Sequence, residues 1–384
     1  MTNHAPHHKK LRVIIAGGGV AALETALALA DLAPDLTDVT VIAPNTEFVY
    51  RPMAVVEPFA YGAARRYPLE QVICDAGADL VTDELAWVEP GKQTIHTGSG
   101  QSIEYDALML ALGAKAVPRY SRALTIDDRR LDETMHGLIQ DVEGGYTQSV
   151  AFVSPGRMAW PLPLYELSLM TAARAFDVGI ELPITLITPE DAPLAIFGAA
   201  VSSAVGDLLT RAGIETITSA YAEIPSQGQV VINPGDRHLT VGRVVALPEL
   251  YGPSLRGIPL GEHGFVRVNR HGRVPDVGPI YAAGDAVEFP IKHGGIASQQ
   301  ADIAAESIAA LAGASITPLP FHPVIRGMLL TGDKPLYLTA HLTGGHGFSS
   351  EVSETATWSP AVKIAAKYLG PALEGYDREH VSVR

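Results

Sequence analysis

The chain has 384 residues and a formal net charge of −14, with 47% hydrophobic and 18% charged residues. This composition supports two buried cores and excludes a disordered chain. The acidic balance leaves no basic stripe for phosphates, so we expect no nucleic-acid partner. The single cysteine, Cys74, excludes an internal disulfide framework and an all-cysteine metal site. We expect no metal, and we expect Cys74 to be an inert, partly buried thiol.

Neither a leader nor a membrane anchor is predicted. Residues 1–10 are polar and rich in histidine, which favours a flexible tail over a metal site and lacks the apolar core of a signal peptide. No run approaches the ~18–20 apolar residues of a membrane span. We therefore expect a cytoplasmic protein, with at most peripheral contact at the inner face of the membrane. A homodimer is compatible with the sequence, which does not decide the oligomeric state.

The first elements in chain order predict a βαβ unit. An apolar run at 11–16 predicts a strand, and the glycine turn at 17–22 leads into a helix over 23–30. A second buried strand follows at 39–43, which implies a parallel sheet with a crossover helix. Residues 105–113 predict a further strand that ends in a glycine turn.

A second block of the same kind follows, and it defines the fold class. The sequence predicts strands at 149–153, 184–188, 264–268 and 280–285, and helices at 164–176, 199–212 and 295–311. We therefore predict an α/β fold with two Rossmann-like domains of the FAD/NAD(P)-binding type and a small C-terminal layer. The expected boundaries are a tail at 1–10, an FAD-binding domain at 11–118 and 257–317, a second domain at 119–256 and the C-terminal layer at 318–384.

The first glycine turn has the residues that a dinucleotide-binding turn requires. Gly17 permits the tight turn out of the strand, Gly19 lets the backbone approach a pyrophosphate, and Ala22 lets the helix pack closely on the sheet. The acid expected at the end of the second strand is missing, because Ala43 stands there. We expect Asn45, or alternatively Glu47, to take over the contact with the ribose.

Three further segments carry a family resemblance. Residues 277–286 closely resemble the late FAD motif of the flavoprotein disulfide reductase superfamily, which implies that Asp285 binds the ribitol chain. Residues 111–113 resemble that superfamily's Ala-Thr-Gly element, with Leu112 in place of threonine, and residues 50–52 resemble the segment that approaches the flavin. The resemblance implies a set of FAD-binding residues: Gly17, Gly19, Ala22, Asn45, Arg51, Pro52, Ala111, Gly113, Gly284, Asp285, Lys292 and Gly294.

The second glycine turn is degraded. Only Gly156 remains, and Trp160 and two prolines fill the turn, so we expect NAD(P)H to bind poorly or unusually. The chain resembles the sulfide:quinone oxidoreductase and flavocytochrome c sulfide dehydrogenase branch in two respects: this glycine motif is absent there too, and residues 193–198 are similar to a segment of that branch. In other respects the chain is similar to type II NADH dehydrogenases, which would place Glu166 near a nicotinamide. The alternative is that Glu166 is an exposed residue in the first turn of a helix.

Lys292, His293 and Glu166 are the candidate catalytic residues. The resemblance places Lys292 at the flavin edge, where its charge would stabilise negative charge, while His293 would relay protons near neutral pH. Both are alternatively solvated loop residues. Residues 358–370 have apolar positions at helical spacing, with Lys363 and Lys367 on one edge of the stripe. We expect this helix to pack over the flavin domain or at a dimer interface, in preference to weak docking on a membrane.

These features favour an FAD-dependent oxidoreductase that passes electrons to or from a quinone-like or small-molecule partner. A redox-active cysteine pair cannot be made from Cys74, so the flavin must carry the chemistry. The alternatives are a type II NADH dehydrogenase-like enzyme and a non-catalytic FAD-binding sensor or interaction protein.

Overall fold

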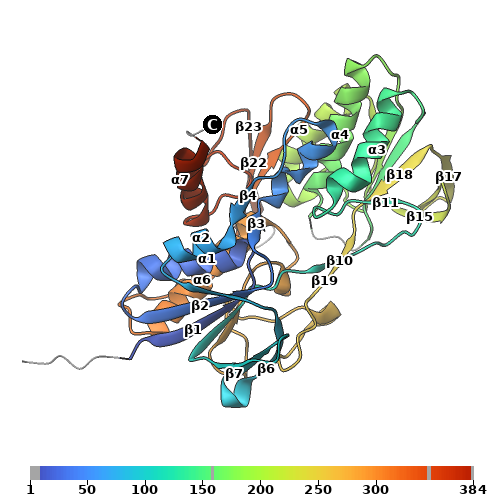
Figure 1. Ribbon diagram of the computed structural model, residues 1–384. Helices are drawn as coiled ribbons and strands as arrows, with labels where there is room; N and C mark the ends of the chain where they lie inside the picture. The colour runs from blue at the N-terminus through green and yellow to red at the C-terminus, as the bar shows by residue number, and fades with distance from the viewer. Residues whose placement is uncertain (1–8, 157–159, 344–346, 382–384) are drawn as a thin grey trace, which may run out of the picture.

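The computed structural model describes residues 9–156, 160–343 and 347–381, which form two lobes with the C-terminal residues between and above them (Figure 1). The expected tail lies almost wholly outside the described residues. The first lobe is built on a five-stranded parallel sheet in the order β20-β9-β1-β2-β5. Its strands are β1 (Leu11–Ala16), β2 (Thr37–Ala43), β5 (Asp79–Thr82), β9 (Ala107–Leu110) and β20 (Ile280–Ala282).

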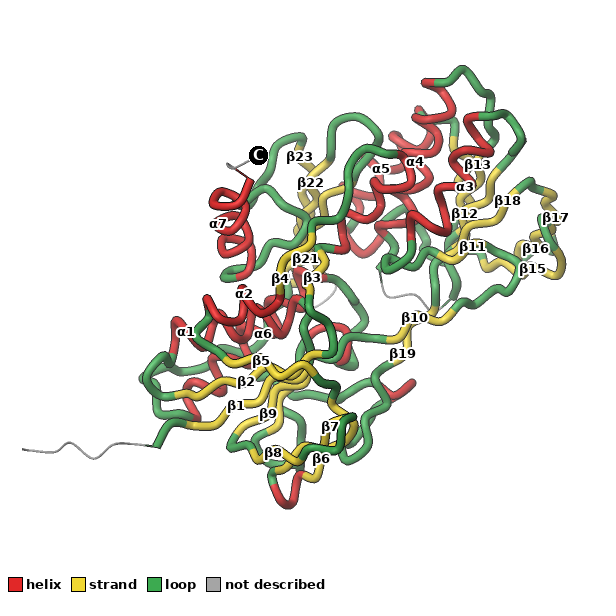
Figure 2. The backbone as a smooth tube through the Cα atoms, viewed as in Figure 1, coloured by secondary structure: helices red, strands yellow, loops and turns green. Residues whose placement is uncertain are grey.

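The two faces of this sheet are covered differently (Figure 2). Helices α1 (Val20–Leu32) and α6 (Gly294–Leu311) pack against each other on one face, with α2 (Leu69–Asp75) beside α1. An antiparallel sheet of β6 (Leu85–Glu89), β7 (Thr94–Thr97) and β8 (Ser102–Glu104) covers the other. Because both faces are buried, β9 is apolar along its whole length.

The second lobe repeats this plan. Its parallel sheet has the order β11-β18-β12-β13-β14. These strands are β11 (Leu124–Thr125), β18 (Arg243–Ala246), β12 (Val150–Val153), β13 (Ile184–Ile187) and β14 (Ile214–Ile217). Helices α3 (Leu131–Glu143), α4 (Leu162–Asp177) and α5 (Ala199–Arg211) pack around it, and β15 (Tyr221–Ser226), β16 (Gln229–Asn233) and β17 (Arg237–Thr240) cover its other face. Strands β10 (Lys115–Val117) and β19 (Glu249–Tyr251) pair antiparallel between the lobes.

The C-terminal layer joins the lobes. Strands β21 (Val324–Leu329), β22 (Leu336–Thr343) and β23 (Gly347–Ser353) form an antiparallel sheet that contacts both α4 and α6. Helix α7 (Leu369–Val381) lies on α1 (Figure 1). The short elements β3 (Glu47–Val49), β4 (Arg66–Pro68) and the 3₁₀ helix η1 (Arg51–Phe59) form the connection over the end of β2. No helix in the described part of the chain is long and apolar enough to cross a membrane.

Three local predictions were wrong. Residues 264–268 are not a strand, because the chain turns at Gly264 with a φ of +79° and only Val266 makes isolated bridges. The helix expected at 358–370 begins only at Leu369, because the backbone N–H groups of residues 364 and 367–369 donate to side chains of the first lobe. Cys74 is exposed, because α2 turns its neighbours Val72 and Ile73 into the core instead.

A pair of phenylalanine substitutions tests the core of the second lobe. Phe152→Ala empties a position of β12 that is fully buried, so we expect the free energy of unfolding to fall by about 3–5 kcal/mol. Phe176→Ala, at a side chain that is 84% exposed, should change it by less than about 0.5 kcal/mol. Equilibrium urea unfolding followed by circular dichroism measures both, and equal losses would contradict the assigned core.

Candidate functional site

The three predicted FAD segments meet at one edge of the first sheet. Strands β1, β9 and β20 are parallel neighbours, so the turns that follow them lie together at their carboxyl ends. A Cβ added to Gly17 would lie 2.2 Å from the Ala111 carbonyl oxygen, and one added to Gly284 would lie 3.2 Å from the Ala21 Cβ. The turns therefore contact one another, and only glycine fits at Gly17, where φ is +125°.

The geometry of this edge fits FAD. No side chain caps the N-terminus of α1, and a Cβ added to Gly19 would meet no atom within 4 Å. A helix N-terminus with free N–H groups and an open approach is suited to a pyrophosphate. A Cβ added to Gly113, whose φ is +70°, would likewise meet no atom within 4 Å. Ala22 is fully buried on the side of α1 that faces the sheet.

Asp285 supplies an acceptor for ligand hydroxyl groups. Among the described residues, none donates a hydrogen bond to its carboxylate. Burial raises the pKa of Asp285 to about 6, while the charge of Lys292 opposes this shift. An acceptor left without a donor is suited to the hydroxyl groups of a ribitol chain.

The ribose side of the cofactor site has an alanine, Ala43, where an acid is usual at the end of β2. Ala43 is fully buried, and a Cβ added to Gly18 would lie 3.0 Å from its Cβ, so the Ala43 methyl group packs closely on the first glycine turn. Glu47 is exposed and forms an ion pair with Arg66 at 3.2 Å. Asn45 is exposed at the same turn, and its contact with the ribose stays a prediction.

Arg51 and Pro52 begin η1, beside this edge. Arg51 pairs with Asp128 at 3.5 Å, and Asp128 lies near enough to Asp285 to raise its pKa further. The structure therefore brings Arg51 close to the late FAD motif. Its contact with the pyrophosphate stays a prediction.

Lys292 is buried, so its interpretation as a solvated loop residue was wrong. Its ammonium group donates to the Val287 carbonyl oxygen and lies 4.0 Å from the centre of the Phe265 ring. Burial lowers the pKa of Lys292 to about 8, against the opposing charges of Asp285 and Glu288. Lys292 therefore carries its positive charge at neutral pH and loses it in mildly alkaline solution.

His293 is the N-cap of α6. Its Nδ1 accepts a hydrogen bond from the Gly295 N–H at 3.2 Å, which assigns the proton to Nε2, and its ring packs on Trp160 with 4.2 Å between centroids. Burial, and then the charge of Lys363, lower the pKa of His293 to about 3. The expectation that His293 titrates near neutral pH was therefore wrong, because the ring is neutral at that pH.

Glu166 and Lys363 form a buried ion pair beside His293. Their charged atoms are 2.6 Å apart, and the two side chains are 1% and 5% exposed. The Glu166 carboxylate also accepts the Leu330 N–H at 3.0 Å. Burial raises the pKa of Glu166 and lowers that of Lys363, and their mutual attraction opposes both shifts. Glu166 is therefore not the exposed helix residue that the sequence also allowed.

Residues 363–369, the C-terminal segment, bring Lys363 to this position. Ile364 packs on Gly294, where an added Cβ would lie 2.8 Å from the Ile364 Cδ1, and its N–H donates to the Tyr50 hydroxyl at 2.8 Å. Three parts of the chain thus meet at the N-terminus of α6: the first lobe, α4 of the second lobe and the C-terminal segment. The sequence predicted Glu166, Lys292 and His293 there but missed Lys363, whose position depends on a segment expected to be helical.

The second glycine turn lacks the space that the first one has. Its residues 157–159 lie outside the described residues, but a Cβ on Gly156 would lie 2.8 Å from the Tyr221 ring. Glu190 follows β13, where a dinucleotide-binding domain carries its ribose-binding acid. Its carboxylate instead accepts the hydroxyl groups of Tyr165 at 2.7 Å and Thr188 at 3.1 Å. Glu190 was not among the predicted site residues, although an acid after the second strand of a βαβ unit is a recognised signal.

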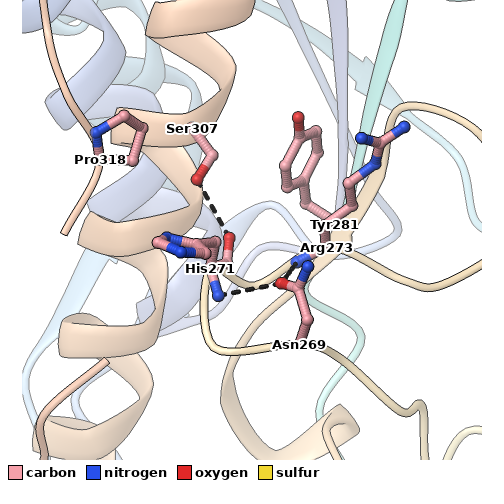
Figure 3. A pocket seen from close by; sticks show the side chains of 6 residues that line it. All are labelled: Asn269, His271, Arg273, Tyr281, Ser307 and Pro318. Carbon is pink, nitrogen blue, oxygen red and sulfur yellow. Dashed lines mark hydrogen bonds between the residues drawn. The ribbon is translucent and has the colours of Figure 1, made fainter. Parts of the chain in front are cut away.

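Figure 3 shows a separate hollow of about 310 Å³ at the outer edge of β20. The Ser307 hydroxyl donates to the His271 carbonyl oxygen there. Its lining contains none of the predicted FAD or catalytic residues: Asn269, His271, Arg273, Tyr281, Ser307 and Pro318. In the part of the chain that the structure describes, no group of three or more histidine, cysteine or acidic side chains is placed to hold a metal ion.

Comparisons with known proteins agree with this geometry. Residues 6–144 match the family described as pyridine nucleotide-disulphide oxidoreductase. The chain is 25% identical over 303 residues to a sulfide-quinone reductase of Aquifex aeolicus, covering 72% of this chain and 69% of that protein. It is 26% identical over 292 residues to an NADH dehydrogenase-like protein of Mycobacterium tuberculosis, covering 71% and 72%.

The crystal structure of the Aquifex aeolicus sulfide:quinone oxidoreductase shares the fold. The TM-score is 0.80 at 20% sequence identity, over 97% of this chain and 91% of that one. The second lobe and the C-terminal layer are included in this overlap, although the family match ends at residue 144.

Two glycine substitutions separate the folding role of the first turn from its binding role. Gly19→Ala adds a methyl group to open space at a negative φ, so we expect unchanged stability of the apoprotein and at least tenfold weaker FAD binding, about 1.4 kcal/mol. Gly17→Ala should destabilise the apoprotein itself by more than about 2 kcal/mol, since the new Cβ meets the Ala111 carbonyl. Fluorescence titration with FAD and thermal unfolding measure these effects, and normal FAD binding by Gly19→Ala would argue against the site.

The buried ion pair makes a second prediction. Lys363→Met leaves Glu166 buried without its partner, so we expect a loss of about 3–5 kcal/mol in the free energy of unfolding. The double variant Glu166→Met with Lys363→Met should recover most of this loss, because no charge remains buried. Lys367→Met, at an exposed lysine of the same segment, is the matched control and should cost little. Equal losses in the single and double variants would show that the pair is not coupled.

Proposed function

We propose that this chain is an FAD-dependent oxidoreductase of the pyridine nucleotide-disulphide oxidoreductase family, and that it passes electrons between its flavin and a quinone-like or small redox partner. The observation that carries the proposal is the group formed by Lys292, His293 and the Glu166–Lys363 pair at the N-terminus of α6. These side chains lie next to the edge where the FAD segments converge. The sulfide-quinone reductase and NADH dehydrogenase-like relatives support the same class of reaction.

FAD, when bound, supplies the two-electron chemistry that no side chain of this chain can perform. Lys292 places a positive charge within the site, where it stabilises negative charge that develops at neutral pH. His293 offers its Nε2–H as a hydrogen-bond donor without changing its own charge. The Glu166–Lys363 pair holds a proton between a carboxylate and an ammonium group in a buried position, from which it can be given to a reduced partner.

The lone cysteine limits the electron donor. Cys74 is exposed on α2, and no second thiol exists to form a redox-active pair. One relative is a sulfide-quinone reductase, but this chain has no pair of cysteines through which sulfide could be oxidised. We therefore propose direct exchange between flavin and partner, and we leave the physiological donor unassigned.

An NAD(P)H dehydrogenase of the type II kind is the second candidate. The buried position of Glu166 favours it, since the family resemblance places this glutamate near the nicotinamide. The contact of Tyr221 with Gly156 and the occupied carboxylate of Glu190 weigh against a dinucleotide in the second lobe. For this reason we rank the quinone-linked function first.

A lipid-soluble quinone would require the protein to work at a membrane surface. We propose peripheral contact with the membrane for that case, and a homodimer is compatible with the proposal. Neither assignment is needed for a water-soluble redox partner.

An anaerobic titration of the FAD-loaded protein tests the proposal. We expect the flavin absorbance to be unaffected by stoichiometric NADH or NADPH, to bleach with dithionite and to return on addition of a soluble quinone analogue. Rapid bleaching by either nucleotide would instead select the dehydrogenase function. Protein that is reduced by dithionite but passes electrons to no quinone, dye or oxygen would point to a non-catalytic role of FAD. Failure to take up FAD at all would refute both enzymatic proposals.

A further inference from the structure

Two carboxyl groups, one fully buried and one partly buried, lie at the far end of the C-terminal segment from Lys363. Glu24, in the apolar helix α1, is fully buried. Its two oxygens accept the backbone N–H groups of three consecutive residues, Lys367, Tyr368 and Leu369, at 2.6–3.0 Å. Because Leu369 is the first residue of α7, Glu24 caps that helix from another part of the chain. Burial raises the pKa of Glu24, whereas the three N–H bonds at the positive end of α7 oppose that shift and favour its charged form.

Asp302 of α6 faces Glu24 across the contact between α1 and α6. Its side chain hydrogen-bonds to Glu24, and its Oδ1 is buried with no hydrogen-bond partner in the described structure. Two carboxylates cannot form such a bond with each other unless one of them carries a proton. Since Glu24 already accepts three N–H groups, the proton belongs on Asp302, which donates it to Glu24.

We propose that Glu24 and Asp302 are positioning residues whose shared proton holds the C-terminal segment, and with it Lys363, in place beside the flavin site. Loss of this proton in alkaline solution leaves two adjacent carboxylates, and their repulsion loosens the segment and the start of α7. The role of Lys363 rests on the proposed function, whereas the sharing of the proton holds for any reaction. Glu24 and Asp302 themselves touch neither substrate nor cofactor.

The charged groups around Glu24 and Asp302 determine how the stability of the C-terminal segment depends on pH. Burial, and then the charge of Glu24, raise the pKa of Asp302 to about 8. Lys367 of the C-terminal segment opposes this shift, while Glu306 of α6 adds to it. On the α1 side, Asp31 bonds to the Tyr368 hydroxyl at 3.2 Å. Since the pKa of Asp302 is raised above its ordinary value, the stabilisation is complete in acid and is lost as the pH rises through about 8.

Hydrogen exchange of the FAD-loaded protein at several pH values tests this proposal. After correction for the intrinsic pH dependence of exchange, we expect protection of the amides of residues 367–369 to fall at least tenfold between pH 7 and pH 9. Asp302→Asn keeps a donor to Glu24 but has no proton to lose, so its protection should change less than threefold. Asp31→Asn is the matched control: it removes a carboxylate that contacts the same segment but leaves the pair intact, and it should follow the unmodified protein.

Several results would overturn the proposal. Constant protection of these amides in the unmodified protein would refute it without any variant, and so would an equal pH response in Asp302→Asn. A second, spectroscopic measurement is the infrared carbonyl band of a protonated carboxyl group, which should disappear on alkaline titration and be missing in Asp302→Asn; its absence at neutral pH in the unmodified protein would also refute the shared proton. If the protein reduces a quinone, the alkaline decline in turnover should be shallower in Asp302→Asn, because only the loss of the Lys292 charge then remains. Failure of all quinone turnover would count against the proposed function and leave the exchange result standing.

Discussion

Buried backbone amides must find acceptors, and in this protein that requirement determines where the C-terminal residues lie. Residues 363–368 form neither helix nor strand, and the N–H groups of Ile364 and of residues 367–369 are bonded to acceptors outside the segment. Tyr50 supplies an acceptor at one end of the segment and Glu24 at the other. Lys363, which directly precedes the first of these anchors, is thereby brought into contact with Glu166, a residue of the other lobe. The same few bonds therefore hold the layer in place, join the lobes and complete the charged group at α6.

The cofactor half of the molecule could be predicted because its physics is local. The run 11–16, the turn at Gly17 and the helix after it are specified by neighbouring residues, and the strand β1 matches the predicted bounds. The same holds for the turn at Gly284, which follows a short buried strand. Glycine turns at the ends of parallel strands come together whenever the sheet forms, so their convergence follows from topology alone.

What could not be predicted depends on partners distant in sequence. The apolar spacing of residues 358–370 favours a helix. Its backbone N–H groups instead donate to side chains more than 300 residues away in the sequence, so the helix does not form over most of this range. The burial of His293 under Trp160, which lowers its pKa, has the same origin. Some signals were nevertheless present: Glu24 interrupts an otherwise apolar helix face, and Glu190 follows a strand where an acid is usual. A charge within an apolar run is itself evidence of a buried partner elsewhere.

The chain enters the second lobe through β10 and leaves it through β19, and these strands are hydrogen-bonded to each other, with Lys115 opposite Tyr251. Residues 118–248 are thus inserted at a single point, with adjacent ends, into a sheet whose remaining strands are made by other residues. Insertions of this kind are replaced or remodelled during evolution with little effect on the host fold. The loss of a working glycine turn in the inserted part, beside an intact one in the host, is the pattern that such modularity permits. A change in the inserted part can therefore leave the sheet that forms the cofactor edge undisturbed.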